Sequence, residues 1–232
     1  ALDPPRVLEN RTCYRLLEVA WPRLVFTAGR YFDGLDVGEA AAHEFAHAVL
    51  TGAAELPLRT AVGDPTDLAR RPAHPAISVL TLRRGRTGPP TFVLHHRDPA
   101  KVAHGGGLYQ VMPVGVVQPA NEAPGALEAD LDLWRCVVRE YAEEFLGRPE
   151  AYGEAVPFDP DGWPFHRRMT AAADAGRLRL WLLGLGVDPL SFATDLLAVA
   201  GRDGTLFEKG RAGLAGRGVA ARPMRRGVDS SA

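Results

Sequence analysis

The sequence predicts an α/β fold, a mixed sheet flanked by helices and preceded by a helical segment. Residues 76–82 and 91–96 are β-branched and apolar runs, and the glycine- and proline-bearing stretch 84–90 between them is typical of a hairpin. Residues 127–146 carry apolar side chains at alternating intervals of four and three, which indicates a helix with one buried stripe. The stripe consists of Leu127, Leu131, Trp134, Val138, Tyr141 and Phe145.

The chain before this sheet is predicted to be helical. Residues 7–53 have the composition of two helices, with a break just before Asp36. Asp36 is suited to cap the second helix, and Gly52 is suited to end it. The helical N-terminal segment therefore covers residues 1–55, and the proline- and glycine-bearing residues 56–75 are expected to form a linker.

The rest of the predicted domain covers residues 76–200. A third strand is expected within residues 108–118, and apolar runs at residues 177–183 and 192–200 predict two more. After residue 200 the periodicity stops, and residues 201–232 carry seven Lys or Arg against three Asp or Glu. This composition predicts a disordered tail.

Composition is that of an ordinary soluble intracellular protein. The 27 basic and 28 acidic residues nearly cancel, so the charge balance does not favour nucleic acid or a membrane surface as partner. Two cysteines far apart in the sequence, Cys13 and Cys136, favour a reducing compartment. No apolar run approaches the roughly 18 residues that a membrane span needs, and the N-terminus has no signal pattern. These observations predict a cytoplasmic protein.

Three glutamates make the predicted helix a candidate metal site. At about 100° per residue, Glu140, Glu143 and Glu144 fall within an arc of roughly 100°, opposite the apolar stripe. Their mutual repulsion would be relieved in part by Arg139 and in part by Mg²⁺ or Mn²⁺, which prefer carboxylate oxygens. A solvated, charged helix face would have the same spacing, and this alternative stays open.

The string RExxEE at residues 139–144, followed by Gly147, resembles the second half of the Nudix box, G-x5-E-x7-R-E-U-x-E-E-x-G-U, where U is a bulky aliphatic residue. The resemblance implies that Glu143 and Glu144 hold the metals that activate water against a nucleoside diphosphate linked to another group. Two positions depart from the pattern: Leu131 stands where the box has glutamate, and Gly147 comes one residue late. These departures predict ligand binding with little hydrolysis, because catalysis tolerates less misplacement than binding.

A second resemblance covers residues 76–200. Residues 95–102, 107–115 and 132–141 are similar to the C-terminal part of actinobacterial helix-turn-helix regulators of the Xre type, which carry a DNA-reading module in front of a Nudix-like portion. Before residue 76 we find no paired short helices with a basic recognition face, so no DNA-binding module is expected in this chain. The resemblance implies the sensing half of a transcriptional regulator.

Three residues are expected to contact the ligand. Arg139 carries charge beside the glutamates, His104 precedes three glycines that would let a phosphate approach, and Tyr109 points into a pocket by the family resemblance. The ligand would be a small phosphorylated or nucleotide-linked metabolite. A Mg²⁺-dependent Nudix pyrophosphohydrolase using the same carboxylates is the first alternative.

A zinc metallopeptidase is the second alternative, because residues 43–47 match H-E-x-x-H within a predicted helix. His43 and His47 share a helical face and could bind Zn²⁺, while Glu44 would act as general base. The extended form of the motif fails, since Leu50 occupies its glycine position and a third ligand would have to be a distant glutamate. We therefore expect that His43 and His47 do not form a zinc site.

Overall fold

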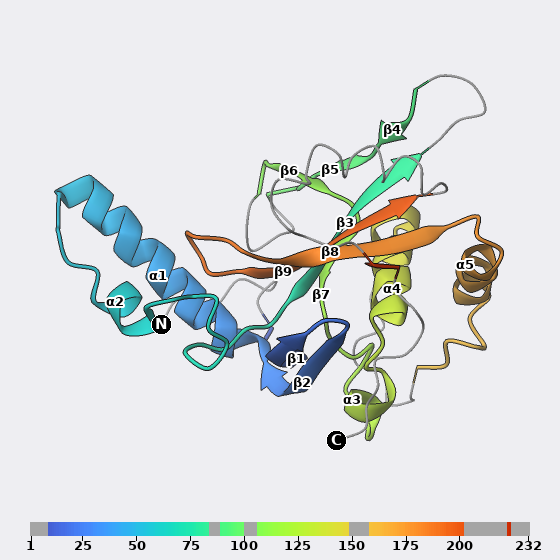
Figure 1. Cartoon of the computed structure of the whole chain (residues 1–232), viewed down its shortest axis with the longest axis horizontal. Coiled ribbons are helices and arrows are strands. Elements are labelled where there is room, and N and C mark those ends of the chain that lie inside the picture. The colour runs from blue at the N-terminus through green and yellow to red at the C-terminus, as the bar shows by residue number, and fades with distance from the viewer. Residues whose placement is uncertain (1–8, 84–88, 100–105, 149–157, 202–221, 224–232) are drawn as a thin grey trace.

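The computed structural model describes residues 9–83, 89–99, 106–148, 158–201 and 222–223 (Figure 1). Its centre is a mixed sheet, on which helix α4 (Leu133–Leu146) packs, with α5 (Pro164–Asp174) against α4. A hairpin near the N-terminus packs against this body, and a long helix, α1 (Tyr31–Thr51), extends from it (Figure 1). The predicted α/β class, with a mixed sheet flanked by helices, is confirmed.

The sheet has the strand order β10-β8-β9-β3-β4, and β7 also pairs with β3. β3 runs parallel to β9 and antiparallel to β4 and β7, which makes the sheet mixed. The predicted strands at residues 76–82, 177–183 and 192–200 are confirmed. The bounds are Ala76–Arg83 for β3, Thr91–Phe92 for β4, Val114–Val116 for β7, Arg179–Val187 for β8, Thr194–Gly201 for β9 and Arg222–Pro223 for β10.

The predicted hairpin and third strand are both divided. β4 pairs with β3 at Leu82 and Phe92, and the chain then leaves the sheet as β5 (Leu94–His96), which pairs with β6 (Tyr109–Val111) in a separate two-stranded ribbon. Pro113 separates β6 from β7 because it has no N–H to donate to a ladder. Residues 108–118 therefore contribute to two sheets instead of one.

The predicted helix at residues 127–146 is interrupted by Asp132. The Asp132 carboxylate accepts hydrogen bonds from the backbone N–H groups of Trp134 and Arg135, at 2.7 and 3.1 Å, and so caps a new helix. The result is a short α3 (Ala126–Ala129) followed by α4 (Leu133–Leu146).

The predicted apolar stripe is buried as expected over most of its length. Val138 is fully buried, and Leu131 and Trp134 pack against the core, whereas Phe145 remains 40% exposed. α5 (Pro164–Asp174) lies against α4, where Thr170 accepts a hydrogen bond from the Trp134 indole. The core beneath consists mainly of Tyr14, Leu16, Leu24, Ile77, Val79, Val117, Leu133, Val137, Leu180 and Leu196.

The prediction of two helices over residues 7–53 is wrong in its first half. Residues Thr12–Ala20 form β1 and Arg23–Arg30 form β2, an antiparallel hairpin. Backbone contacts with distant segments support the extended conformation: the N–H groups of Tyr14 and Leu16 donate to the carbonyls of Val117 and Ala73, at 3.1 and 2.8 Å. Such tertiary pairing overrides local helix propensity.

The second predicted helix is present as α1 (Tyr31–Thr51), but it begins before Asp36. Asp33 provides the start, because its side chain accepts a hydrogen bond from the Arg30 backbone N–H at 3.1 Å. The helix ends at Gly52 as predicted, with φ of 74° in the left-handed region. Within the predicted linker, Pro57–Val62 form the short helix α2.

α1 packs on the body through small residues. A Cβ atom at Gly38 would lie 2.5 Å from the Ser191 carbonyl oxygen, and Ala41 is fully buried. The bulky Phe45, Val49 and Leu50 are exposed instead. Small residues thus set the distance between α1 and the turn before β9.

We expect Gly38→Ala to lower the free energy of unfolding by about 1 to 3 kcal/mol, because the new methyl group collides with backbone that cannot swing away. Alanine is intrinsically better in a helix by up to about 1 kcal/mol, so propensity alone predicts the opposite sign. Urea unfolding monitored by circular dichroism distinguishes destabilisation by the collision from stabilisation by helix propensity. Ala46→Gly, at an exposed position of α1, measures the propensity contribution, and a stabilised Gly38→Ala would contradict the close approach.

Candidate functional site

Glu140 and Glu144, one helical turn apart on α4, both face strand β7. Glu140 is 8% exposed, and a Cβ atom at Gly115 would lie 1.9 Å from its carboxyl carbon. Glu144 accepts a hydrogen bond from the Val114 backbone N–H at 3.3 Å. The face that carries these glutamates is therefore covered by β7, and the absence of a side chain at Gly115 makes room for the Glu140 carboxylate.

Glu144 is a buried carboxyl group with unused hydrogen-bonding capacity. Its side chain is 13% exposed, and burial raises its pKa from the ordinary 4.5 to about 7, while the Val114 N–H and the Arg97 charge act in the opposite direction. His95 Nδ1 lies 3.9 Å from Glu144 Oε1. Within the described part of the chain, neither Glu144 Oε2 nor His95 Nδ1 has a hydrogen-bond partner, although both atoms are buried.

The β5–β6 ribbon supplies the side chains opposite α4. His95 pairs with Gln110 across the ribbon, and Arg97, two residues after His95, donates a hydrogen bond from its guanidinium group to the Gln110 side-chain oxygen. Alternation along an extended chain places His95 and Arg97 on the same side. We call Glu144, His95, Arg97 and Gln110, together with Glu140 one turn away on α4, the carboxylate–histidine cluster.

Two members of this cluster, His95 and Arg97, are not among the site residues that the sequence predicts. His95 and His96 point to opposite faces of the ribbon, as alternation along a strand predicts: His95 faces Glu144, whereas His96 contacts the Tyr109 ring at 4.9 Å between centroids. The role of His95 beside a carboxylate, and that of Arg97, were missed. The alternation of side chains along the strand places His95 and His96 on opposite faces, but it does not predict which face contacts α4.

The third predicted metal ligand, Glu143, is half-buried on α4. Helical geometry places it about 60° from Glu140, on the side away from Glu144. Among the described residues, no three His, Cys, Asp or Glu side chains gather into a group that could hold a metal ion. The structure therefore brings together two of the three predicted carboxylates.

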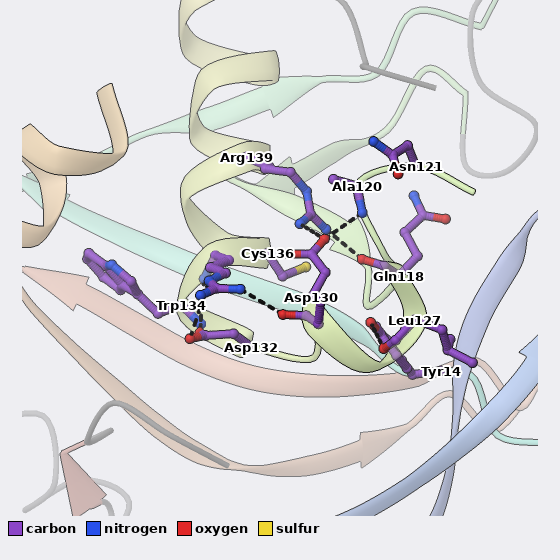
Figure 2. A network of polar contacts seen from close by, with 12 residues as sticks. Tyr14, Gln118, Ala120, Asn121, Leu127, Asp130, Asp132, Trp134, Cys136 and Arg139 are labelled. Atoms are coloured by element: carbon purple, nitrogen blue, oxygen red, sulfur yellow. Dashed lines mark hydrogen bonds and ion pairs between the residues drawn. The ribbon is translucent and has the colours of Figure 1, made fainter. Parts of the chain in front are cut away.

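Arg139, predicted to contact the ligand, is engaged in a buried network on another side of α4 (Figure 2). Its guanidinium group donates to Asp130 at 2.7 Å and to the Gln118 carbonyl at 2.5 Å. Asp130 also accepts from the Ala120 backbone N–H at 2.6 Å. Burial raises the pKa of Asp130, and the Arg139 charge counteracts that rise. Arg139 thus ties α4 to the loop after β7.

The same network includes the residue next to Leu131, which stands where the Nudix pattern has glutamate. Leu131 packs against the core, and the preceding Asp130 forms the ion pair with Arg139. The acidic residue that pairs with Arg139 thus stands one position before Leu131.

The other two predicted ligand contacts are not part of the carboxylate–histidine cluster as described. Tyr109 is 70% exposed on the side of the ribbon that carries His96, away from His95 and Gln110. His104 lies outside the described residues.

The H-E-x-x-H motif lies on α1, where its glutamate has a structural role. The Glu44 carboxylate accepts hydrogen bonds from the backbone N–H groups of Leu58 and Arg59, at 2.7 and 3.0 Å, and so caps the first turn of α2. His43 has an 84% exposed side chain, 3.9 Å from the Glu39 carboxylate, and His47 is exposed. A carboxylate bound to two N–H groups does not fit the general base of a zinc peptidase.

No protein-family model, no curated protein and no solved structure matches this chain. The similarity to the Nudix box and to Xre-type regulators therefore depends on the residues themselves. Among the described residues, no helix is long and apolar enough to cross a membrane.

Proposed function

We propose that this chain is a Nudix-like ligand-sensing domain of a transcriptional regulator, and that the carboxylate–histidine cluster binds a small phosphorylated or nucleotide-linked metabolite together with Mg²⁺ or Mn²⁺. One observation carries the proposal: the buried Glu144 carboxyl group has an oxygen without a partner among the described residues, next to His95. Buried polar atoms are normally satisfied, so two unsatisfied buried atoms on neighbouring side chains suggest a ligand.

The cluster supplies the groups that a phosphate–metal pair requires. Mg²⁺ in proteins is commonly bound by one or two carboxylates and completed by water and substrate phosphates, so Glu140 and Glu144 suffice without a third carboxylate. Arg97 offers guanidinium donors suited to phosphate oxygens. Its hydrogen bond with Gln110 orients the guanidinium group before a ligand arrives.

Titration of Glu144 would couple metal binding to pH. A carboxyl group binds a metal ion in its ionised form, and the pKa of about 7 leaves Glu144 largely protonated at pH 6. Binding of Mg²⁺ with a phosphorylated ligand should therefore release a proton and be tighter at pH 8 than at pH 6.

Calorimetric titration tests this proposal, with nucleotide sugars, dinucleotides and nucleoside triphosphates as probes, with and without Mg²⁺. We expect Mg²⁺-dependent binding at pH 8 that Glu140→Gln weakens by about 10- to 100-fold. Arg97→Gln should also weaken it. Glu128→Gln, on the exposed side of α3, is the matched control and should bind as the wild type does. Absence of binding by every probe, or equal losses in the control, would reject the proposal.

One observation favours a Nudix pyrophosphohydrolase as a second function. A carboxyl group with a pKa of about 7 is suited to act as a general base near neutral pH, and Glu144 is such a group. Mg²⁺-dependent turnover of the same probes, abolished by Glu143→Gln, would establish the hydrolase. We expect little turnover, because Leu131 and the displaced Gly147 depart from the box that positions metal and phosphate.

A further inference from the structure

The imidazole of His74 lies between two glycines on different elements. A Cβ atom at Gly29 of β2 would be 2.5 Å from His74 Nε2, and one at Gly34 of α1 would be 2.6 Å from Nδ1. Neither distance allows a side chain. Glycine is unfavourable inside both a strand and a helix, so its presence at both positions is explained by the close approach of this ring.

His74 stands at the junction between the extending elements and the sheet. The carbonyl of the preceding Ala73 accepts from Leu16 of β1 at 2.8 Å, and that of the following Pro75 accepts from Val117 at 2.9 Å. β3 begins directly afterwards, at Ala76. A change at His74 would thus act on the packing of the hairpin and α1 against the body.

The surroundings of the ring disfavour a positive charge. Both ring nitrogens are buried, and neither has a hydrogen-bond partner among the described residues. Burial lowers the pKa of His74, the charges of Arg15 on β1 and Arg71 lower it further, and Asp33 at the start of α1 opposes them. Protonation would place a third cation beside two arginines, with one carboxylate to balance it.

We propose that His74 is a pH-sensitive latch, whose neutral ring holds the β1–β2 hairpin and α1 against the segment leading into β3 and whose protonation releases them. Because the closed arrangement lowers the pKa of His74, a fall in pH weakens that arrangement. The stabilisation of the closed arrangement by the neutral ring is fully present above the ordinary histidine pKa of about 6.5. It is lost as the pH falls below that value, because protons then favour the opened state.

Hydrogen exchange resolved by residue tests the latch in the full chain. After correction for intrinsic exchange rates, the opening constant of amides in β1 and β2 should rise by about three- to tenfold from pH 6.5 to 5.5, tenfold being the limit for one proton. His74→Gln cannot take up this charge and should remove the dependence. His166→Gln is the matched control: His166 is also buried, burial lowers its pKa as well, and it lies on α5.

A second measurement applies if His74→Gln does not fold. The ring resonances of His74 in the wild-type protein should titrate below pH 6.5, and the hairpin amides should open over the same range. Acid opening that persists in His74→Gln, opening that disappears in His166→Gln, or a His74 ring that titrates above 6.5 would overturn the latch.

Discussion

Replacing Arg139 by methionine is expected to lower the free energy of unfolding by about 3 to 5 kcal/mol, the usual cost of leaving one partner of a buried ion pair behind. Arg139 and Asp130 are 8% and 6% exposed. Without the guanidinium group, Asp130 keeps the hydrogen bond from the Ala120 N–H, and its pKa rises further. The loss should therefore grow with pH, since the ionised carboxylate is the form that burial penalises.

Urea unfolding of paired variants isolates the ion pair. Arg139→Met combined with Asp130→Asn should recover part of the loss, because the double variant buries no unpaired charge. Arg135→Met is the matched control, one turn earlier on α4, where the arginine is 3.8 Å from Asp132 in a more exposed pair and its loss should cost about 1 kcal/mol or less. Equal losses for Arg135→Met and Arg139→Met would contradict the structural role of the network.

Glu144→Gln should instead stabilise the protein, by about 2 to 3 kcal/mol at pH 8. The folded-state pKa of about 7 lies above the ordinary 4.5, so the folded protein binds more protons than the unfolded chain between these values. The stabilisation that protonated Glu144 gives the folded state is thus fully present below pH 4.5 and is lost as the pH rises through 7. At about 1.4 kcal/mol per pKa unit, the full difference is roughly 3 kcal/mol, and residual solvent contact reduces it.

Thermal and urea unfolding between pH 5 and 8 measures this difference. Asp130 and Asp195 also have raised pKa values and act in the same direction in both proteins, so the difference between wild type and Glu144→Gln reports on Glu144. The two curves should converge towards pH 5 and separate towards pH 8, and Glu128→Gln should follow the wild type. A variant that is less stable than the wild type at pH 8 would refute a buried, unsatisfied Glu144.

Together the two variants show which residue of this short motif supports the stability of the fold and which one supports ligand binding. Arg139→Met should lose stability, whereas Glu144→Gln should gain stability and lose Mg²⁺-dependent ligand binding. A gain in stability at the expense of binding is expected where a site keeps an unfavourable group for its ligand.

The sequence by itself determined the elements whose signal is local and strong. β3, β8 and β9 follow from β-branched and apolar runs, and α4 follows from the part of the apolar stripe that includes Trp134 and Val138. Gly52 ended α1 as predicted, because a left-handed residue is required there. The side-by-side position of Glu140 and Glu144 also follows from helical geometry alone.

The tertiary structure alone decided the β1–β2 hairpin, which side of the β5–β6 ribbon faces α4, and the contacts that Glu44 makes. Residues 12–30 contain good helix formers, and their pairing with each other and with the distant Val117 makes them strands. Glu44 has the spacing of a catalytic base, yet a helix fourteen residues away uses its carboxylate as a cap. Periodicity shows which residues of an element share a face, but which neighbour covers that face depends on contacts between segments far apart in the chain.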